Sequence, residues 1–438
     1  MEFSFFIFDQ VLPNLLNYII IVFISAIVVF FLYRFFMYSI YEIGLMWIVI
    51  FGVIFSLSNC IFLYQRNFIE QKYLINYIAT TGIFYLVIIF FHWSLDIKNF
   101  YKTRAVKKKK EDIDNSQEIY GFAFLIFWII LNVLKILIFG IRSNEKIGGG
   151  TGLILRLLWL VTPILTHTIL YMLFYRKWKK TALIYFILTF LFGIFSISRG
   201  AMITVIFGVL TFIFLNPTCR TAKRYIKKYG VILICIGIVF GILLVSIMND
   251  STYFDSALTI AYRFIAFGDV YPFIYVNQVA DKISSTIDVS FFDFMLSSVM
   301  PMYRLASHED FSDTNLIGLI VDEVRGPGSK TGPNMRFNVA GYIFWGESAS
   351  ILFAIFCAII FCVVHILVVK SINMNYKIQM VAVLLASSLI SLEQDVSLVP
   401  TFLGNIPLFL LIFSYLEIVI LGAKAFKVDY NISHNFKK

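Results

Sequence analysis

The chain has 438 residues, of which 60% are hydrophobic and only 14% are charged, and its formal net charge is +10. Soluble domains carry about 25% charged residues, so this composition excludes an ordinary soluble protein. Apolar runs of about 20 residues recur along the chain, each long enough to cross about 30 Å of hydrocarbon as a helix. The runs do not alternate as the strands of a membrane barrel do. The sequence therefore predicts an all-α polytopic membrane protein, and the positive charge indicates cytoplasmic loops, not a nucleic-acid partner.

Eleven helical spans are expected in chain order: 14–33, 44–64, 73–93, 119–141, 157–175, 182–197, 201–216, 230–248, 350–369, 378–396 and 402–422. This pattern gives eight spans in residues 1–248, one long loop over 249–349, and three spans with a tail over 350–438. The tenth span is weak because Glu393 and Asp395 lie near its end, so a ten-helix arrangement also remains open.

Basic loops alternate along this arrangement and set its orientation. The segments "KTRAVKKKK" (102–110), "RKWKK" (176–180) and "RTAKRYIKK" (220–228) follow the third, fifth and seventh spans. The positive-inside rule places them in the cytoplasm, together with the lysine-bearing C-terminal tail. The first ten residues contain no Lys or Arg. We therefore expect the N-terminus and the loop 249–349 on the outer face, which is the periplasm in a bacterium with two membranes.

Cysteines and intramembrane histidines fit the interior of a bundle better than a metal or disulfide framework. The five cysteines include no CxxC pair and lie in or beside apolar runs. Three histidines (His92, His167 and His365) lie in or near spans without partners at ligand spacing, so we expect buried, hydrogen-bonded side chains. Lys135 lies inside the fourth span and should have a partner within the bundle.

Arg199 interrupts about thirty apolar residues, in the stretch "FGIFSISRGAMITVIFG" (192–208). A charge at bilayer depth costs several kcal/mol and tends to mark function. In the expected orientation Arg199 caps a tight hairpin between the sixth and seventh spans at the outer face. A guanidinium that extends to lipid phosphates is the alternative explanation.

The long outer loop holds twelve acidic and six basic residues, so the positive-inside bias does not explain its arginines. Arginine binds phosphate through a planar pair of donors and stays charged when partly dehydrated. Several arginines on one face predict a phosphate or pyrophosphate clamp, although each could instead pair with a nearby carboxylate. The basic candidates in this loop are Arg263, Arg304, Arg325, Lys330 and Arg336. Within the loop, amphipathic segments are expected to pack back onto the bundle as a lid.

Motifs in matching order resemble an oligosaccharide repeat-unit polymerase, the Wzy-type O-antigen and capsule polymerase family. They are "GGGTG" (148–152), the proline-bearing "LLWLVTPIL", "SISRGAMI", "AYRFIAFGD", "MPMYR" and "KTGPNMRFNVAGYIFWG". Together they cover residues from about 145 to 346. Relatives carry an acidic residue and an asparagine after the TGP that this chain lacks in "AGYIFWG" (340–346). The resemblance implies a GT-C-like, membrane-embedded glycosyltransferase that works at the periplasmic face of the bacterial inner membrane.

The resemblance also implies the substrates. The donor is a glycan on undecaprenyl pyrophosphate, and the acceptor is a single repeat unit on the same lipid. No cofactor and no metal is needed, because the lipid pyrophosphate is already an activated leaving group. A chain-length regulator protein is a further candidate partner, besides membrane lipid.

On this interpretation arginines stabilise the negative charge that develops on the departing pyrophosphate. We expect Arg199, Arg263 and Arg304 in that role, with Arg325, Arg336 and Lys330 as further candidates. The base that accepts the proton of the acceptor hydroxyl is expected to be His308, Asp269 or Glu323, in no fixed order. A solvated surface position is the alternative for His308. A lipid-linked oligosaccharide flippase or other transporter, an O-antigen ligase and a non-catalytic envelope scaffold remain the alternative functions.

Overall fold

The computed structural model describes residues 5–106, 116–139, 152–176, 178–196, 199–249, 252–265, 268, 270–287, 290–296, 324, 336–394, 396, 399–400, 403–415 and 418. About 91% of the described residues are helical, and these residues include no strand. The all-α class predicted from the sequence is therefore confirmed.

Five helices of the described chain are long and apolar enough to cross a membrane. They are Phe6–Phe36, which includes α2 (Leu15–Phe36), then α4 (Trp47–Gln65), α5 (Gln71–Ser94), Tyr120–Ile138 within α7 (Ser116–Phe139), and α17 (Phe337–Lys370). They coincide with the first four expected spans and with the ninth.

The other expected spans also coincide with helices, although their passage through a membrane stays a prediction. These helices are α8 (Gly152–Arg176), α9 (Lys179–Ser196), α10 (Arg199–Leu215), α11 (Arg220–Asn249), α18 (Tyr376–Gln394) and Leu403–Tyr415. Short helices connect or cover them: α3 (Ile40–Leu45), α6 (Ile97–Val106), α12 (Tyr253–Ile265), α13 (Val270–Ile274), α14 (Val279–Thr286) and α15 (Phe291–Leu296).

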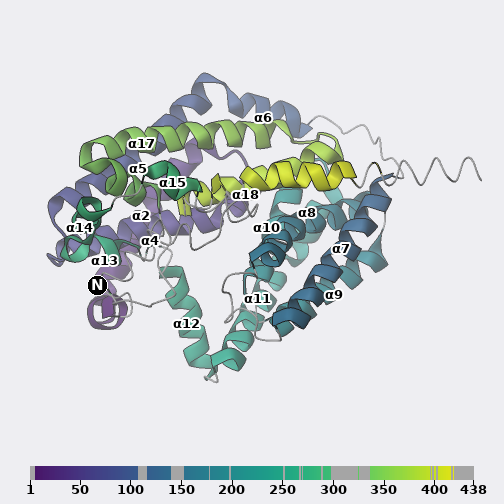
Figure 1. Ribbon diagram of the computed structural model, residues 1–438, viewed down its shortest axis with the longest axis horizontal. Coiled ribbons are helices and arrows are strands. Elements are labelled where there is room, and N and C mark those ends of the chain that lie inside the picture. Colours follow the sequence, from purple (N-terminus) through teal and green to yellow (C-terminus); the bar gives the residue numbers. More distant parts are fainter. Residues whose placement is uncertain are drawn as a thin grey trace, which may run out of the picture.

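Two hydrophobic clusters hold the helices together, and α18 belongs to both. The first joins α2, α4, α5 and α17 with α13 and α14, and the second joins α7, α8 and α9 with Leu403–Tyr415. On α18, Leu389 and Leu392 lie in the first cluster, whereas Tyr376 and Met380 lie in the second. Figure 1 shows α18 beside α17 and extending toward α8 and α10. Helix α18 therefore packs against both halves of the bundle and joins them.

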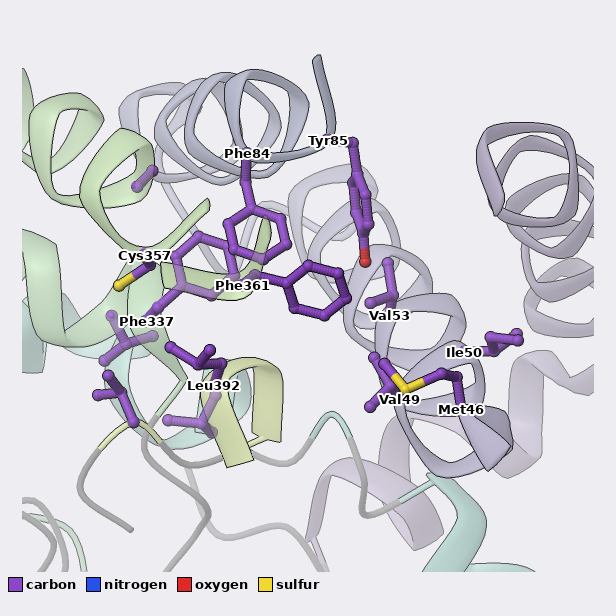
Figure 2. Packing of buried hydrophobic residues seen from close by; sticks show 14 of the residues in the cluster. Met46, Val49, Ile50, Val53, Phe84, Tyr85, Phe337, Cys357, Phe361 and Leu392 are labelled. Carbon is purple, nitrogen blue, oxygen red and sulfur yellow. The ribbon is translucent and has the colours of Figure 1, made fainter. Parts of the chain in front are cut away.

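Helix α17 reverses its direction at Gly346, where the backbone has φ 77° and ψ 179°. Residues 337 and 361 would lie about 36 Å apart along a straight helix. Instead the rings of Phe337 and Phe361 both contact Phe84, with centroids 4.6 and 5.8 Å away (Figure 2). Residues 337–345, which we call the short arm, therefore fold back beside residues 347–370, the long arm.

Close packing between the two arms depends on Gly341. A Cβ atom added there would lie 2.9 Å from Cδ1 of Phe353 on the long arm. Phe84 lies about halfway along α5. The inner end of the short arm is thus in the middle of the bundle, about 15 Å from the reversal. Non-helical backbone at this depth is tolerated where protein buries it.

The histidines of the expected spans behave as the sequence indicates, because His92, His167 and His365 are buried and hydrogen-bonded. Lys135 is buried in α7, and its partner within the bundle stays a prediction. No disulfide joins the five cysteines, and four of these are buried, whereas Cys235 on α11 is exposed.

Replacing Gly346 by alanine tests the reversal. A side chain at this φ/ψ combination costs about 1 to 3 kcal/mol. We expect Gly346→Ala to unfold at a lower temperature than the wild type in detergent. The control is Gly82→Ala on α5, where an added Cβ meets no atom within 4 Å. Equal melting temperatures for the two variants would contradict the reversal.

Candidate functional site

The site is built around Arg336, which precedes the short arm at its N-terminus. Its backbone is extended, with φ −72° and ψ 151°, and its carbonyl accepts the N–H of Ala340 at 3.0 Å, which starts the helix. The chain reversal at Gly346 points this N-terminus into the middle of the bundle. A helix N-terminus carries a partial positive charge and favours anions.

The guanidinium of Arg336 is enclosed by the bundle. The residue is 3% exposed, and its Nε and Nη2 have no hydrogen-bond partner among the described residues. Gly52 on α4 makes room for it, since a methyl group at that position would overlap with Nη2. Buried charged donors without acceptors are costly, so this group favours a ligand with anionic oxygens.

Tyrosine hydroxyls and one carboxylate surround Arg336. Electrostatic interactions link it to Tyr271 on α13, Tyr77 and Tyr85 on α5, and Glu393 on α18. The hydroxyl of Tyr271 donates to Oδ1 of Asn338 at 2.9 Å, which fixes it beside the first turn of the short arm. Three segments far apart in the sequence, α5, α13 and α18, thus converge on one cation.

Glu393 does not neutralise Arg336 through an ion pair. Its Oε2 accepts the Tyr85 hydroxyl at 2.7 Å and the Tyr33 hydroxyl at 3.2 Å, and the two hydroxyls lie 2.9 Å apart. The described carboxylates include none that forms an ion pair with Arg336. Glu393 is fully buried, so these tyrosines hold the carboxylate in place and leave the arginine donors to another acceptor.

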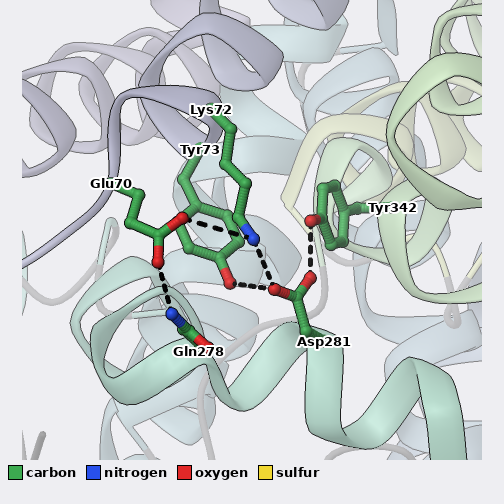
Figure 3. A network of polar contacts seen from close by, with 6 residues as sticks. All are labelled: Glu70, Lys72, Tyr73, Gln278, Asp281 and Tyr342. Atoms are coloured by element: carbon green, nitrogen blue, oxygen red, sulfur yellow. Dashed lines mark hydrogen bonds and ion pairs between the residues drawn. The ribbon is translucent and has the colours of Figure 1, made fainter.

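A second polar network, centred on Asp281 of α14, holds the short arm from outside (Figure 3). Oδ2 of Asp281 accepts from Lys72 Nζ at 2.6 Å and from the Tyr73 hydroxyl at 2.8 Å, while Oδ1 accepts from the Tyr342 hydroxyl at 2.6 Å. Lys72 also lies 3.4 Å from Glu70, which accepts a hydrogen bond from Gln278. The network ties α5, α14 and the short arm together.

Opposing effects act on the pKa of Asp281. Burial raises the pKa of this carboxyl, but the hydrogen bonds from Lys72, Tyr342 and Tyr73, with the charge of Lys72, outweigh burial. The pKa therefore lies below its ordinary value.

Of the predicted site residues, the structure describes the side chain of Arg336 alone. Arg199 begins α10 and Arg263 belongs to α12, which are helices whose positions are described without these two side chains. The remaining predicted residues lie outside the described residues: Asp269, Arg304, His308, Glu323, Arg325 and Lys330.

Sequence reasoning did not identify the neighbours of Arg336. Glu393 carried a signal, because an acidic residue within an apolar helix calls for a buried partner. The tyrosines carried none, since 24 tyrosines are spread over the chain. The described residues contain no group of three or more His, Cys, Asp or Glu that could hold a metal ion.

Comparisons with known proteins identify no family for this chain. No family model, no curated protein and no solved structure matches it. The geometry around Arg336 and the motifs in the sequence are therefore the observations that bear on its function.

Stability should depend on pH through Asp281. A carboxyl whose pKa is lowered by folding stabilises the protein above its unfolded pKa of about 3.9, and this contribution is lost as the pH falls through the lower folded pKa. At neutral pH we expect the free energy of unfolding of the wild type to exceed that of Asp281→Asn by about 1 to 2 kcal/mol. The difference is modest because the ion pair is partly solvated, and the two free energies should converge below about pH 4.

Thermal unfolding in detergent at a series of pH values measures this difference. Asp293→Asn is the control, since Asp293 is exposed and bonds within its own turn to Ser290. Parallel pH profiles for wild type and Asp281→Asn would contradict the assignment.

Proposed function

We propose that the protein is a membrane-embedded glycosyltransferase that polymerises oligosaccharide repeat units carried on undecaprenyl pyrophosphate. The observation that carries the proposal is the buried guanidinium of Arg336, with two donors unpaired among the described residues, at an inward-pointing helix N-terminus. Both features favour an anion such as pyrophosphate. The order of motifs resembling Wzy-type polymerases adds independent support.

The depth of the site suits a lipid substrate. The inner end of the short arm lies at the level of Phe84, halfway along an apolar helix that is long enough to span a membrane. A pyrophosphate attached to a lipid approaches such a site from the bilayer, whereas a nucleotide sugar approaches from water. The sequence has no phosphate-binding loop for a nucleotide.

Catalysis follows from the charge that develops as the anomeric C–O bond breaks. Negative charge grows on the departing pyrophosphate, and a fixed guanidinium stabilises this charge more in the transition state than in the ground state. Arg336 supplies the inner donors in this proposal. Arg199, Arg263, Arg304, Arg325 and Lys330 stay candidates for the outer donors, and His308, Asp269 and Glu323 for the base that takes the acceptor proton.

The second candidate is a transporter of the same lipid-linked oligosaccharide. Broken helices whose N-termini point at anionic groups near the bilayer midplane are typical of transporters. The reversal at Gly346 gives this chain such a half-helix.

Purified protein in liposomes with lipid-linked repeat units separates the candidates. Chain growth without added nucleotide supports the polymerase. Movement of the unit across the membrane without growth supports the transporter. Transfer that requires added lipid A core supports a ligase.

Two substitutions test Arg336 from both sides. Arg336→Gln removes the charge, and Gly52→Ala forces the guanidinium to move while retaining it. Each should reduce the rate of chain growth by about a hundredfold, the effect of losing one donor to a developing oxyanion. Gly82→Ala, in open space on α5, should grow chains at the wild-type rate.

Chain length is read on a gel, and thermal unfolding in detergent shows that each variant folds. Folded Arg336→Gln protein that makes polymer at the wild-type rate would overturn the proposed role.

A further inference from the structure

Four side chains that do not belong to the site around Arg336 form a continuous line of hydrogen bonds. The Tyr38 hydroxyl lies 2.8 Å from Nδ1 of His92, and Nε2 of His92 lies 3.1 Å from Nδ1 of His365. Nε2 of His365 then lies 2.5 Å from Oε1 of Glu42. The two imidazole planes are 13° apart, with centroids separated by 4.7 Å.

This line runs from a half-buried residue into the protein. Tyr38 is partly exposed, whereas His92, His365 and Glu42 are 1% to 2% exposed. Its members come from α5, α17, α3 and the connection between α2 and α3. Glu42 is held firmly, because its second oxygen accepts the backbone N–H of Tyr38 at 2.7 Å and its own N–H donates to Ser39.

Three hydrogen bonds connect the four groups, and each contact holds one hydrogen. Neutral imidazole has one donor and one acceptor nitrogen, so the hydrogens in the line must all point the same way. In one direction Tyr38 donates to His92, His92 to His365, and His365 to the Glu42 carboxylate. In the other direction Glu42 is protonated and donates outward, and the hydroxyl hydrogen of Tyr38 points away from the line.

The two directions preserve every hydrogen bond and differ by one proton. When a hydronium ion in the adjoining water gives a proton to the Tyr38 oxygen and becomes water, the hydroxyl hydrogen of Tyr38 passes to Nδ1 of His92. The Nε2 hydrogen of His92 passes to His365, and the Nε2 hydrogen of His365 passes to Glu42. Both imidazoles end neutral, Tyr38 is again a hydroxyl, and the carboxylate has become a carboxylic acid.

We propose that Tyr38, His92, His365 and Glu42 form a proton-transfer site that takes one proton from water at Tyr38 and stores it on Glu42. Chains of His and acidic residues inside membrane proteins commonly relay protons. Histidine is the side chain best suited to pass a proton near neutral pH. This inference does not rest on the proposed glycosyl transfer.

Other titratable groups lie around the line without joining it. Asp96 and Cys362 interact electrostatically with Tyr38, Tyr101 of α6 hydrogen-bonds to Ser39, and Tyr41 lies on α3 beside Glu42. Of the described residues, His365 alone pairs with the Glu42 carboxylate. Within the described part of the chain, the carboxylate therefore has a single route by which to receive a proton along hydrogen bonds.

Aromatic rings separate this site from Glu393. Phe36 contacts both His92 and Tyr85, with centroids 5.9 Å away in each case, and Phe361 stacks on His365 at 5.9 Å. Both phenylalanines are fully buried. A proton that enters at Tyr38 therefore stops at Glu42 and does not pass on to Glu393.

Infrared spectroscopy of the full-length protein in detergent micelles tests where the proton is stored. As the pH is lowered over the range in which the protein stays folded, the wild type should gain the carbonyl band of a protonated carboxylic acid in a buried environment. Glu393→Gln, which keeps Glu42 as the one remaining carboxylate of this buried pair, should retain the band, and the double variant Glu42→Gln/Glu393→Gln should lack it. Absence of the band from Glu393→Gln, or its persistence in the double variant, would overturn the proposal.

A kinetic measurement separates proton transfer from a purely structural role. Tyr38→Phe keeps the ring against His92 and removes the hydroxyl. After a rapid drop in pH the band should reach its full height but appear about tenfold more slowly or slower still, because the relay has lost its outer member. Tyr41→Phe should keep the wild-type rate, and an unchanged rate in Tyr38→Phe would refute the transfer path.

Discussion

A guanidinium buried among apolar helices requires acceptor oxygens, and this requirement organises the centre of the protein. Arg336 stands at the inner end of a nine-residue helix that reverses into the bundle at Gly346. Gly341 lets the reversed helix lie against Phe353, and Gly52 gives the guanidinium its space. Three glycines on two helices thus permit one charge to sit at mid-depth. Glu393, the carboxylate that interacts electrostatically with Arg336, is hydrogen-bonded to two tyrosines and not to the arginine.

Helices α5 and α17 carry two polar levels, one above the other. Tyr77 and Tyr85 belong to the level of Arg336, and His92 belongs to the level of Glu42. Phe36 and Phe361 lie between the levels and keep them apart. Polar groups are expensive in an apolar bundle, so two polar layers that share the same helices indicate two separate tasks.

The length of the apolar runs made the helices predictable from the sequence. About 20 apolar residues in a row specify a helix wherever the chain cannot reach water, and all eleven expected spans coincide with helices. The reversal at Gly346 was not predictable, because "FNVAGYIFWGESASILF" is helical on both sides of the break and a single glycine decides its direction.

Residues with a charge were easier to find than their partners. Arg336 stood out as an arginine in an acidic loop, and His92 and His365 as histidines in apolar runs. Their contacts join residues hundreds of positions apart, such as Tyr85 with Glu393 and Glu42 with His365. Such pairings arise from helix packing, which local patterns do not encode.

The position of α18 has a mechanical consequence. Near its start, Gln379 is fixed to Asn216 and to the carbonyl of Leu215 at the end of α10. Glu393 lies fourteen residues further along, about 21 Å from this pivot. A rigid tilt of α18 by about 5° would therefore displace the Glu393 carboxylate by about 2 Å while Gln379 stayed in place. Small movements of α8, α9 and α10 that tilt α18 would in this way produce a larger displacement of the Glu393 carboxylate. The second half of the bundle would thereby change the surroundings of Arg336 in the first half.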